Sequence, residues 1–337
     1  MSATQEELFK IIKLKLIGKE SLANALSDIL HISPDAVYRR YRGETSLTID
    51  EIKRLCIHFD ISFDFLIKSN NGQAIFNYQP LDSFDFRLES YLEGILNSLR
   101  HLKSLSEPHF ILSISNNHIF QLVNFPQLMR FRLFFWAKTH LLVPEYQKIK
   151  YFHQKTSETA FAIGEEILQL YTSIPSTEIF DPELMRGFMR QILYYYKSHL
   201  FEDPSYALFL CDRMLLFSKH LQIQAEIGKK FIYGQELPSE GNKFEMYLNE
   251  TINTDSTIYY SGKETSGIFL THNIMNYLQT VDKKYVLDSK QILDKQLANS
   301  SLISEVNEKE RNNYFFEFEK MILSFRKKNR SRPRVLR

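Results

Sequence analysis

The sequence predicts an α+β protein that is mainly α-helical, with a small helical N-terminal domain and a larger, mostly helical domain that contains a small β-sheet. Glycine and proline are scarce, at 11 and 10 of 337 residues, so the chain has few obligatory turns. Apolar residues recur at helical spacing over most of the chain. Two segments, near residues 109–123 and 243–271, are instead rich in the β-branched and aromatic residues that favour strands.

Composition and length are typical of a soluble globular protein. Hydrophobic residues make up 44% of the chain and charged residues 24%, and 337 residues suggest two or three units. No apolar run is long enough to span a bilayer, and Glu6 and Glu7 lie where a signal peptide would be basic. Cys56 and Cys211 are too few for a disulfide framework. We therefore expect a cytoplasmic protein that has no membrane partner.

The first domain is expected over residues 1–67 and consists of short helices. The predicted helices cover residues 6–16, 21–30 and 34–42, followed by a fourth helix after residue 48 and a short helical turn from residue 62. Thr48 and Glu51 form a capping box at the start of the fourth helix. Its apolar stripe comprises Ile49, Ile52, Leu55, Cys56 and Phe59, and the last turn is expected to bury Phe63, Phe65 or Leu66. A polar linker is predicted at 68–80.

The second domain is expected over residues 81–327, followed by a basic tail at 328–337. Its predicted helices cover residues 81–104, 126–142, 145–173, 182–200, 204–230, 285–298 and 305–327. The first strand segment predicts a hairpin of strands 109–114 and 118–123, joined at two asparagines. From Arg326 onward the chain has seven basic residues and no acidic one. This predicts either non-specific phosphate contacts or a solvated tail.

Residues 26–42 have the layout of a helix, a tight turn and a second helix. Ser33 is suited to cap the second helix, with Pro34 at its first position. Projection of this helix at 100° per residue places Val37 and Tyr41 toward the domain interior and Ala36 and Arg40 on the flanks. The face that points away from the interior comprises Asp35, Tyr38, Arg39 and Arg42. Arginine is suited to the acceptor edge of guanine and to phosphates, so this face predicts contact with DNA.

This segment resembles the Cro/CI-type (xenobiotic-response-element) helix-turn-helix, and is closer still to the BetR-like variant found in bacterial regulators, often from Bacteroidetes. The resemblance covers about residues 5–67 and rests on the strings DAVYRRYRGE at 35–44, LTIDE at 47–51 and ISFDFL at 61–66. In that family the helix equivalent to 34–42 lies in the major groove of double-stranded DNA.

The resemblance therefore implies roles for particular side chains. Asp35, Tyr38, Arg39 and Arg42 would read DNA, and we add Ser33 as a phosphate contact. Two recognition helices one DNA turn apart would read an inverted repeat, so the family also implies a homodimer.

Two positions depart from the family pattern. His31 stands where the turn is usually glycine, and Ser27 stands at the usual small helix contact. Histidine tolerates positive φ, so we expect the turn to form. Residues 1–67 are also nearly neutral in net charge. Affinity would therefore depend on local contacts and on dimerisation.

The second domain contains no catalytic pattern that would indicate an enzyme. The motifs GxGxxG, GxSxG, HExxH and the Walker loop are missing. Two starts of HxKxxxxD fail, because Pro108 and Ala160 stand where aspartate is required. His272 is the best candidate for a polar ligand contact, although a structural role is the more common one. Aromatic clusters at 131–136, 194–196 and 314–316 predict core packing first, and a pocket or dimer face second.

Two hypotheses for the function follow. The first is a sequence-specific DNA-binding transcription regulator, not an enzyme, whose C-terminal domain senses an unknown effector or mediates homodimerisation. The second is a protein–protein interaction module that uses the helix-turn-helix fold without sequence-specific DNA binding. No cofactor and no metal are expected in either case.

Overall fold

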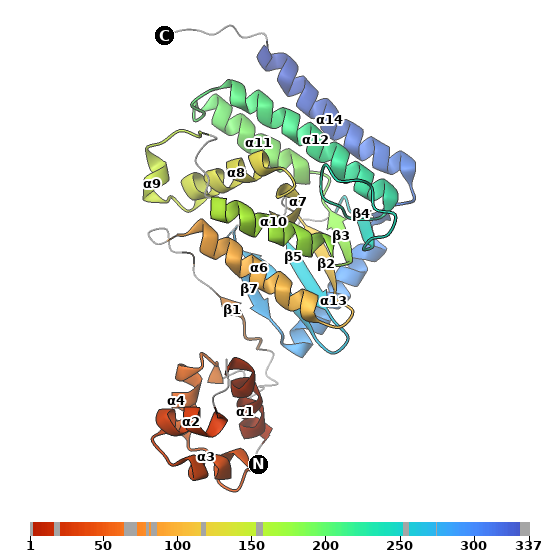
Figure 1. Cartoon of the computed structure of the whole chain (residues 1–337). Helices are drawn as coiled ribbons and strands as arrows, with labels where there is room; N and C mark the ends of the chain where they lie inside the picture. Colours follow the sequence, from red (N-terminus) through yellow and green to blue (C-terminus); the bar gives the residue numbers. More distant parts are fainter. Residues whose placement is uncertain are drawn as a thin grey trace. The chain divides into compact units, whose positions relative to one another are not determined.

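The computed structural model describes residues 3–16, 21–63, 73–78, 81, 86–115, 119–152, 158–251, 256–273 and 275–330. The chain forms two compact units, Met1–Ile75 and Phe76–Arg337 (Figure 1). The first is helical, and the second combines a large mixed sheet with helices. The predicted α+β class, mainly α-helical, is confirmed at this level. None of the described helices combines the length and apolar character needed to cross a bilayer.

Four helices build the first unit. They are α1 (Ala3–Lys15), α2 (Leu22–Leu30), α3 (Pro34–Tyr41) and α4 (Ile49–His58), close to the predicted ranges. Their apolar faces meet in one small core made by Leu8, Phe9, Ile12, Ala23, Leu26, Leu30, Val37, Leu47, Leu55, Cys56 and Ile61. Each helix forms because its apolar residues recur every three or four positions and face this core.

Two details of the first unit differ from the prediction. Ile49 is 77% exposed and does not belong to the buried stripe of α4, because the first residue of this helix points away from the core. Phe63 is also exposed, at 40%. Phe65 and Leu66, which were predicted to be alternatives to Phe63, lie outside the described residues.

The second unit is organised around an eight-stranded sheet of order β1-β7-β6-β5-β2-β3-β4-β8. The strands are β1 (Asn77–Tyr78), β2 (His109–Ile114), β3 (Ser176–Phe180), β4 (Phe244–Leu248), β5 (Thr257–Ser261), β6 (Ser266–His272), β7 (Asn276–Thr280) and β8 (Ser301–Leu302). Strands β2, β3 and β4 are parallel, and the others pair antiparallel. The sheet is larger than predicted, because β3 and β7 are short and carry no clear alternation of polar and apolar residues.

The predicted hairpin at 109–123 is wrong. Residues 109–114 do form β2, but its partners are β3 and β5 from distant parts of the chain. Ile119–Leu122 is a short helix, α7, and residues 116–118 lie outside the described part. All but the first residue of β2 are buried, as is typical of a central parallel strand covered on both faces.

Two other segments also differ from their predicted structure. Within the expected linker at 68–80, Asn77 and Tyr78 form β1 and pair with β7. The single helix predicted at 145–173 is interrupted: α9 spans Pro144–Gln147, an isolated bridge joins Tyr151 to Phe201, and α10 spans Glu158–Thr172. In both segments, pairing with distant residues decides the local structure.

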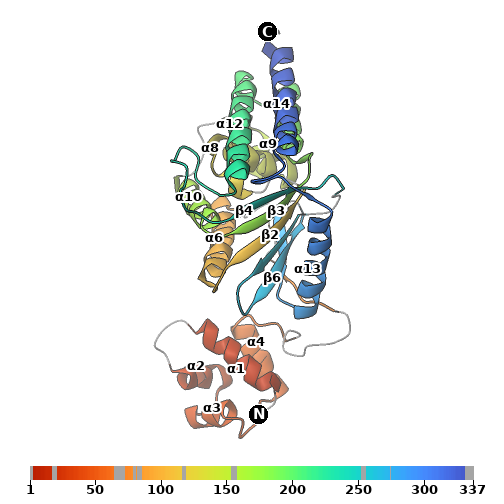
Figure 2. The ribbon, with the colours of Figure 1, turned by 90° about the vertical axis from the view of Figure 1, so that its right-hand side faces the viewer.

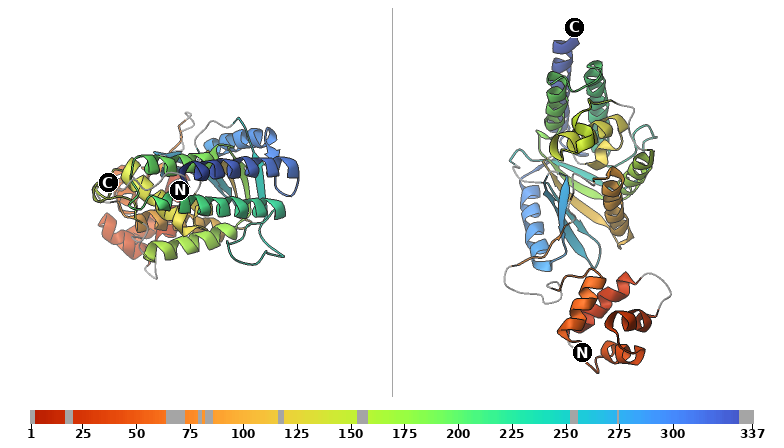
Figure 3. Two further views of the ribbon diagram at one scale, coloured as in Figure 1. Left: turned by 90° about the horizontal axis from the view of Figure 1, so that it is seen from above. Right: turned by 90° about the vertical axis from the view of Figure 1, so that its left-hand side faces the viewer.

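Helices cover both faces of the sheet. Helices α6 (Leu88–Ser104) and α10 pack together on one face, and α13 (Lys283–Ala298) lies on the other (Figures 2 and 3). Helices α11 (Leu184–Lys197), α12 (Ser205–Ile227) and α14 (Glu308–Arg330) pack against one another. Helix α8 (Pro126–Phe135) continues directly into a π-helical turn, η1 (Trp136–His140).

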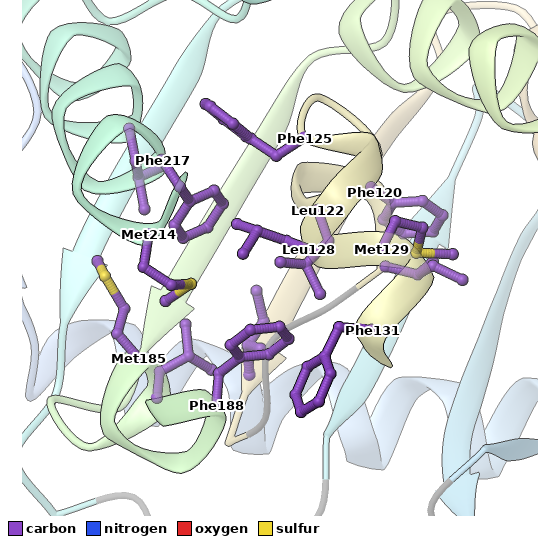
Figure 4. Packing of buried hydrophobic residues seen from close by; sticks show 14 of the residues in the cluster. Phe120, Leu122, Phe125, Leu128, Met129, Phe131, Met185, Phe188, Met214 and Phe217 are labelled. Atoms are coloured by element: carbon purple, nitrogen blue, oxygen red, sulfur yellow. The ribbon is translucent and has the colours of Figure 1, made fainter. Parts of the chain in front are cut away.

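The main core lies between these helices and the sheet. Figure 4 shows aromatic and methionine side chains from α7, α8, α11 and α12 converging there. The Phe131 and Phe188 rings have centroids 5.8 Å apart, and the Phe125 and Phe217 rings are separated by the same distance. Both pairs are edge-to-face, the arrangement that aromatic quadrupoles favour.

Candidate nucleic-acid interface

The turn between α2 and α3 depends on a left-handed residue. His31 has φ 57° and ψ 44°, and its backbone N–H donates to the carbonyl of Ser27. The Ser27 hydroxyl in turn donates to the carbonyl of Ile32 at 2.6 Å. The turn therefore forms with histidine in place of glycine, as expected. The hydroxyl of Ser27 also satisfies a turn carbonyl, a role that the sequence did not indicate.

Helix α3 starts at a capped N-terminus. The Ser33 hydroxyl accepts a hydrogen bond from the Ala36 N–H at 3.3 Å, and Pro34 occupies the first helical position. Val37 is buried, and the Tyr41 ring packs edge-to-face on Phe9 with centroids 5.5 Å apart. The inward face of this helix is therefore the predicted one.

The opposite face of α3 carries the predicted contact residues, all exposed to solvent. The Arg39 guanidinium lies 3.2 Å from the Asp35 carboxylate, and the Arg42 guanidinium lies 2.9 Å from Glu44. All four of these side chains are more than half exposed. Tyr38, on the same face, is 47% exposed. Exposed ion pairs of this kind contribute about 1 kcal/mol or less, so both arginines can exchange partners at little cost.

Arg40 has a different role from its two arginine neighbours. Its guanidinium contacts Glu51 at 2.7 Å and 3.1 Å and also donates to the carbonyl of Ala36. The side chains of this pair are only 15% and 12% exposed. Glu51 simultaneously completes the capping box with Thr48. Burial acts to raise the pKa of Glu51, but the hydrogen bonds from Arg40 and Thr48 outweigh it and lower that pKa.

Gln5 of α1 positions the segment that follows α3, a role that sequence reasoning missed. Its amide nitrogen donates to the carbonyls of Arg40 at 2.7 Å and Thr45 at 3.1 Å, and its amide oxygen accepts from the Leu47 N–H at 3.0 Å. Gln5 is only 5% exposed. A polar residue in line with the core positions Leu8, Phe9 and Ile12 was the available signal.

His272, the predicted ligand contact of the second domain, lies at the end of β6. Its ring packs edge-to-face on Tyr78, with centroids 5.7 Å apart, and its Nε2 lies 3.0 Å from the Asn273 amide. The surroundings of His272 therefore indicate a structural residue at the end of an inner strand.

The three aromatic clusters mostly contribute to the core, as predicted. Phe131, Tyr195 and Phe315 are at most 1% exposed, whereas Tyr194 and Phe316 are more than half exposed. Among the described residues no three His, Cys, Asp or Glu side chains are arranged to hold a metal ion.

A buried polar network surrounds Glu178 on β3. Its carboxylate accepts hydrogen bonds from the Tyr171 hydroxyl at 2.7 Å and the Ser176 hydroxyl at 2.8 Å. Nearby, the ammonium of Lys230 lies 4.1 Å from the centre of the Tyr171 ring, and the part of the chain that is described offers it no hydrogen-bond acceptor. Burial lowers the pKa of Lys230 to about 7, against the opposing effect of Glu178. No sequence pattern pointed to these residues.

Comparison with known proteins gives no match: no family model, curated protein or solved structure corresponds to the chain. The resemblance of residues 5–67 to the Cro/CI-type helix-turn-helix therefore rests on the segments 35–44, 47–51 and 61–66.

Proposed function

We propose that the chain is a sequence-specific DNA-binding transcription regulator whose helix α3 enters the major groove. The observation that carries this proposal is the division of roles among Arg39, Arg40 and Arg42, at the C-terminal end of α3. Arg40 is held by Glu51 and shielded from solvent, whereas Arg39 and Arg42 project from the exposed face with only surface partners. A structural helix has no need of two such arginines beside the exposed Tyr38.

Local charge supports specific contact over non-specific attraction. Asp35 and Glu44 offset the charges of Arg39 and Arg42, so the face has little net field to hold random phosphates. An arginine that already lies in a defined rotamer can exchange its carboxylate for guanine O6 and N7. Asp35 itself can accept from a cytosine amino group. Ser33, whose hydroxyl caps α3, would lie next to the phosphate backbone of the bound DNA.

A rigid support for α3 fits the same role. Gln5 holds the carbonyl of Arg40 and the residues after α3, and the Arg40–Glu51 pair ties α3 to α4. A base-reading helix must be placed to within a fraction of an ångström, because bidentate hydrogen bonds tolerate little displacement. These contacts cross from α3 to α1 and α4.

The remaining parts of the proposal concern the second unit and the tail. We propose that Phe76–Arg337 senses an effector or mediates homodimerisation, and that the protein acts in the cytoplasm. The tail after Arg326 would add phosphate contacts. Arg326 itself forms an ion pair with Asp212 at 2.8 Å, so it is engaged in the fold.

A protein-interaction module is the second candidate, favoured by a specific surface. Ile49 and Ile57 of α4 are 77% and 72% exposed, and Phe63 is 40% exposed. Exposed apolar side chains that form a patch are typical of a contact with another protein, and Ile49 and Ile57 come from the same helix. Under this alternative α3 would show no preference among DNA sequences.

Selection of binding sites from a random DNA library by the purified full chain tests the proposal. Arg39→Ala is expected to weaken binding to the selected site by about 1–3 kcal/mol, and binding to random DNA much less. Arg100→Ala is the matched control, because Arg100 forms a similar exposed ion pair with Glu166 in the second unit. Equal loss on both DNAs would make Arg39 a phosphate contact. Failure to select any sequence, even at low salt, would favour the interaction module.

A further inference from the structure

Arg132, in the last turn of α8, is a buried cation for which the described residues provide no acidic partner. The residue is 3% exposed, and its Nη1 donates to the amide oxygen of Gln191 at 2.6 Å. Its Nε is buried and has no acceptor among the described residues. Removing one guanidinium from water without a counter-ion costs several kcal/mol. The neutral amide of Gln191 accepts a hydrogen bond but does not supply the negative charge of a counter-ion.

Aromatic side chains surround this guanidinium. It lies 4.6 Å from the centre of the Trp136 ring and 5.8 Å from that of Phe188. Burial lowers the pKa of Arg132 to about 10, and the neighbouring hydroxyl groups of Tyr91 and Tyr277 act in the opposite direction. Arg132 therefore remains positively charged near neutral pH, and the described residues around it provide ring faces and hydroxyls but no carboxylate.

A second donor at the same place also has no acceptor. The indole Nε1 of Trp136 is buried, and the described part of the chain provides it with no hydrogen-bond partner. Buried donors in folded proteins are nearly always satisfied, and here two residues in contact, Arg132 and Trp136, each carry an unsatisfied one. Trp136 begins the π-helical turn η1, and π-helical turns often occur at functional sites.

We propose that Arg132 and Trp136 together bind the carboxylate of a small organic acid. A carboxylate would accept hydrogen bonds from the free Nε of Arg132 and from the indole N–H, and would neutralise the buried charge. One guanidinium balances one negative charge, which favours a monocarboxylate over a polyphosphate. The aromatic surroundings favour an acid with an apolar body. A role for this acid as an effector of DNA binding rests on the proposed function, whereas the binding itself does not.

Lys230, another buried cation of the unit, carries no such proposal. The carboxylate of Glu178 lies close enough to influence it electrostatically, so its charge has a partner within the protein. Arg132 differs because the described groups that interact with it electrostatically are Tyr91, Tyr277 and His140, none of which is a carboxylate.

The single tryptophan of the chain makes this site directly observable. Because Trp136 contacts the guanidinium, its fluorescence is expected to change on binding. The full chain would be titrated with benzoate, hexanoate and inorganic phosphate at constant ionic strength. A saturable change with benzoate or hexanoate is expected at millimolar concentrations or below. Arg132→Met is expected to weaken it by about tenfold or more, since a charge-assisted hydrogen bond is lost.

Two further variants keep the result interpretable. Arg190→Met removes an exposed arginine of α11 and is expected to leave the titration unchanged. Arg132→Lys retains the charge but loses the planar fork, and is expected to bind more weakly than the wild type even if Arg132→Met does not fold. No saturable change with any of the three anions, or equal affinity after both Arg132 substitutions, would overturn the site. Saturation by phosphate alone would overturn its assignment to a carboxylate.

An operator-binding assay separates this inference from the proposed function. If benzoate or hexanoate binds through Arg132 while the chain selects no DNA sequence, the site stands and the regulator proposal fails. If the chain selects DNA but Trp136 responds to none of the anions, the regulator proposal stands and the site fails.

Discussion

The two units of this protein treat charge in opposite ways. In the first unit Gln5 is the only polar side chain among the described residues that is fully buried, and the arginines of α3 are either exposed or ion-paired. The second unit buries Arg132, Lys230 and Glu178 in its interior. A small domain has little apolar area to offset the desolvation of a charge, whereas a large core can tolerate such groups.

This contrast separates two kinds of candidate site. On α3 the proposed functional side chains lie at the surface, and the structural side chains hold the helix against α1 and α4. In the second unit the chemically distinctive groups lie within the core, where the low dielectric strengthens every interaction they make. Four substitutions test the contrast, in order of decreasing effect.

Gln5→Met should destabilise the first unit most. The substitution leaves the buried Leu47 N–H and the carbonyls of Arg40 and Thr45 without their side-chain partner, a loss of about 3 kcal/mol. Hydrogen–deuterium exchange of the full chain would show faster exchange confined to residues 1–75. Gln222→Met, which removes an exposed hydrogen bond to Asn312, is the control. Equal effects of the two substitutions would mean that the first unit does not depend on its one buried amide.

Lys230→Met should instead raise the free energy of unfolding and so stabilise the second unit. Because burial lowers the pKa of Lys230 from 10.5 to about 7, the unfolded chain binds one more proton than the folded chain between these values. Wild-type stability therefore rises with pH over this range, and the gain of the variant is largest below pH 7, at about 2–3 kcal/mol. Thermal unfolding at pH 6 and pH 9.5 measures it. The same gain at both pH values would contradict the inferred burial cost.

Glu51→Ala should cost about 2 kcal/mol at neutral pH, since it removes the capping box and leaves Arg40 without its partner. The pKa of Glu51 is lowered in the folded state. Its contribution to stability is therefore complete above the ordinary pKa of 4.5, and it is lost as the pH falls through the lower pKa of the folded state. Urea unfolding of wild type and variant at pH 7 and at acid pH measures the difference. Glu166→Ala, at an exposed pair, should cost much less.

His31→Gly should have the smallest effect, a gain of about 0.5 kcal/mol, because glycine adopts the left-handed conformation without strain but loses more entropy on folding. His31→Ala serves as the control and should not stabilise. A gain with alanine equal to that with glycine would mean that the turn carries no backbone strain. Melting curves of both variants provide the measurement.

Several elements could be predicted closely because their signals are local. The start of α3 at Pro34, the burial of Val37 and the capping box of α4 all depend on residues within one or two helical turns. The hairpin at 109–123 was wrong because a central strand takes its partners from far away in the chain. Strand β2 pairs with β3 more than sixty residues later, and its apolar run is equally compatible with either arrangement.

The sequence by itself determined which face of α3 is exposed, because helical periodicity is a property of neighbouring residues. The tertiary structure alone decided which cations have partners. Arg40 meets Glu51 only because α3 and α4 pack together, and Gln5 reaches the end of α3 only because α1 lies beside it. Arg132 meets no carboxylate among the residues of the second unit that the structure describes. The partner of a charged side chain depends on which distant segments pack around it, so the local spacing of residues does not predict that partner.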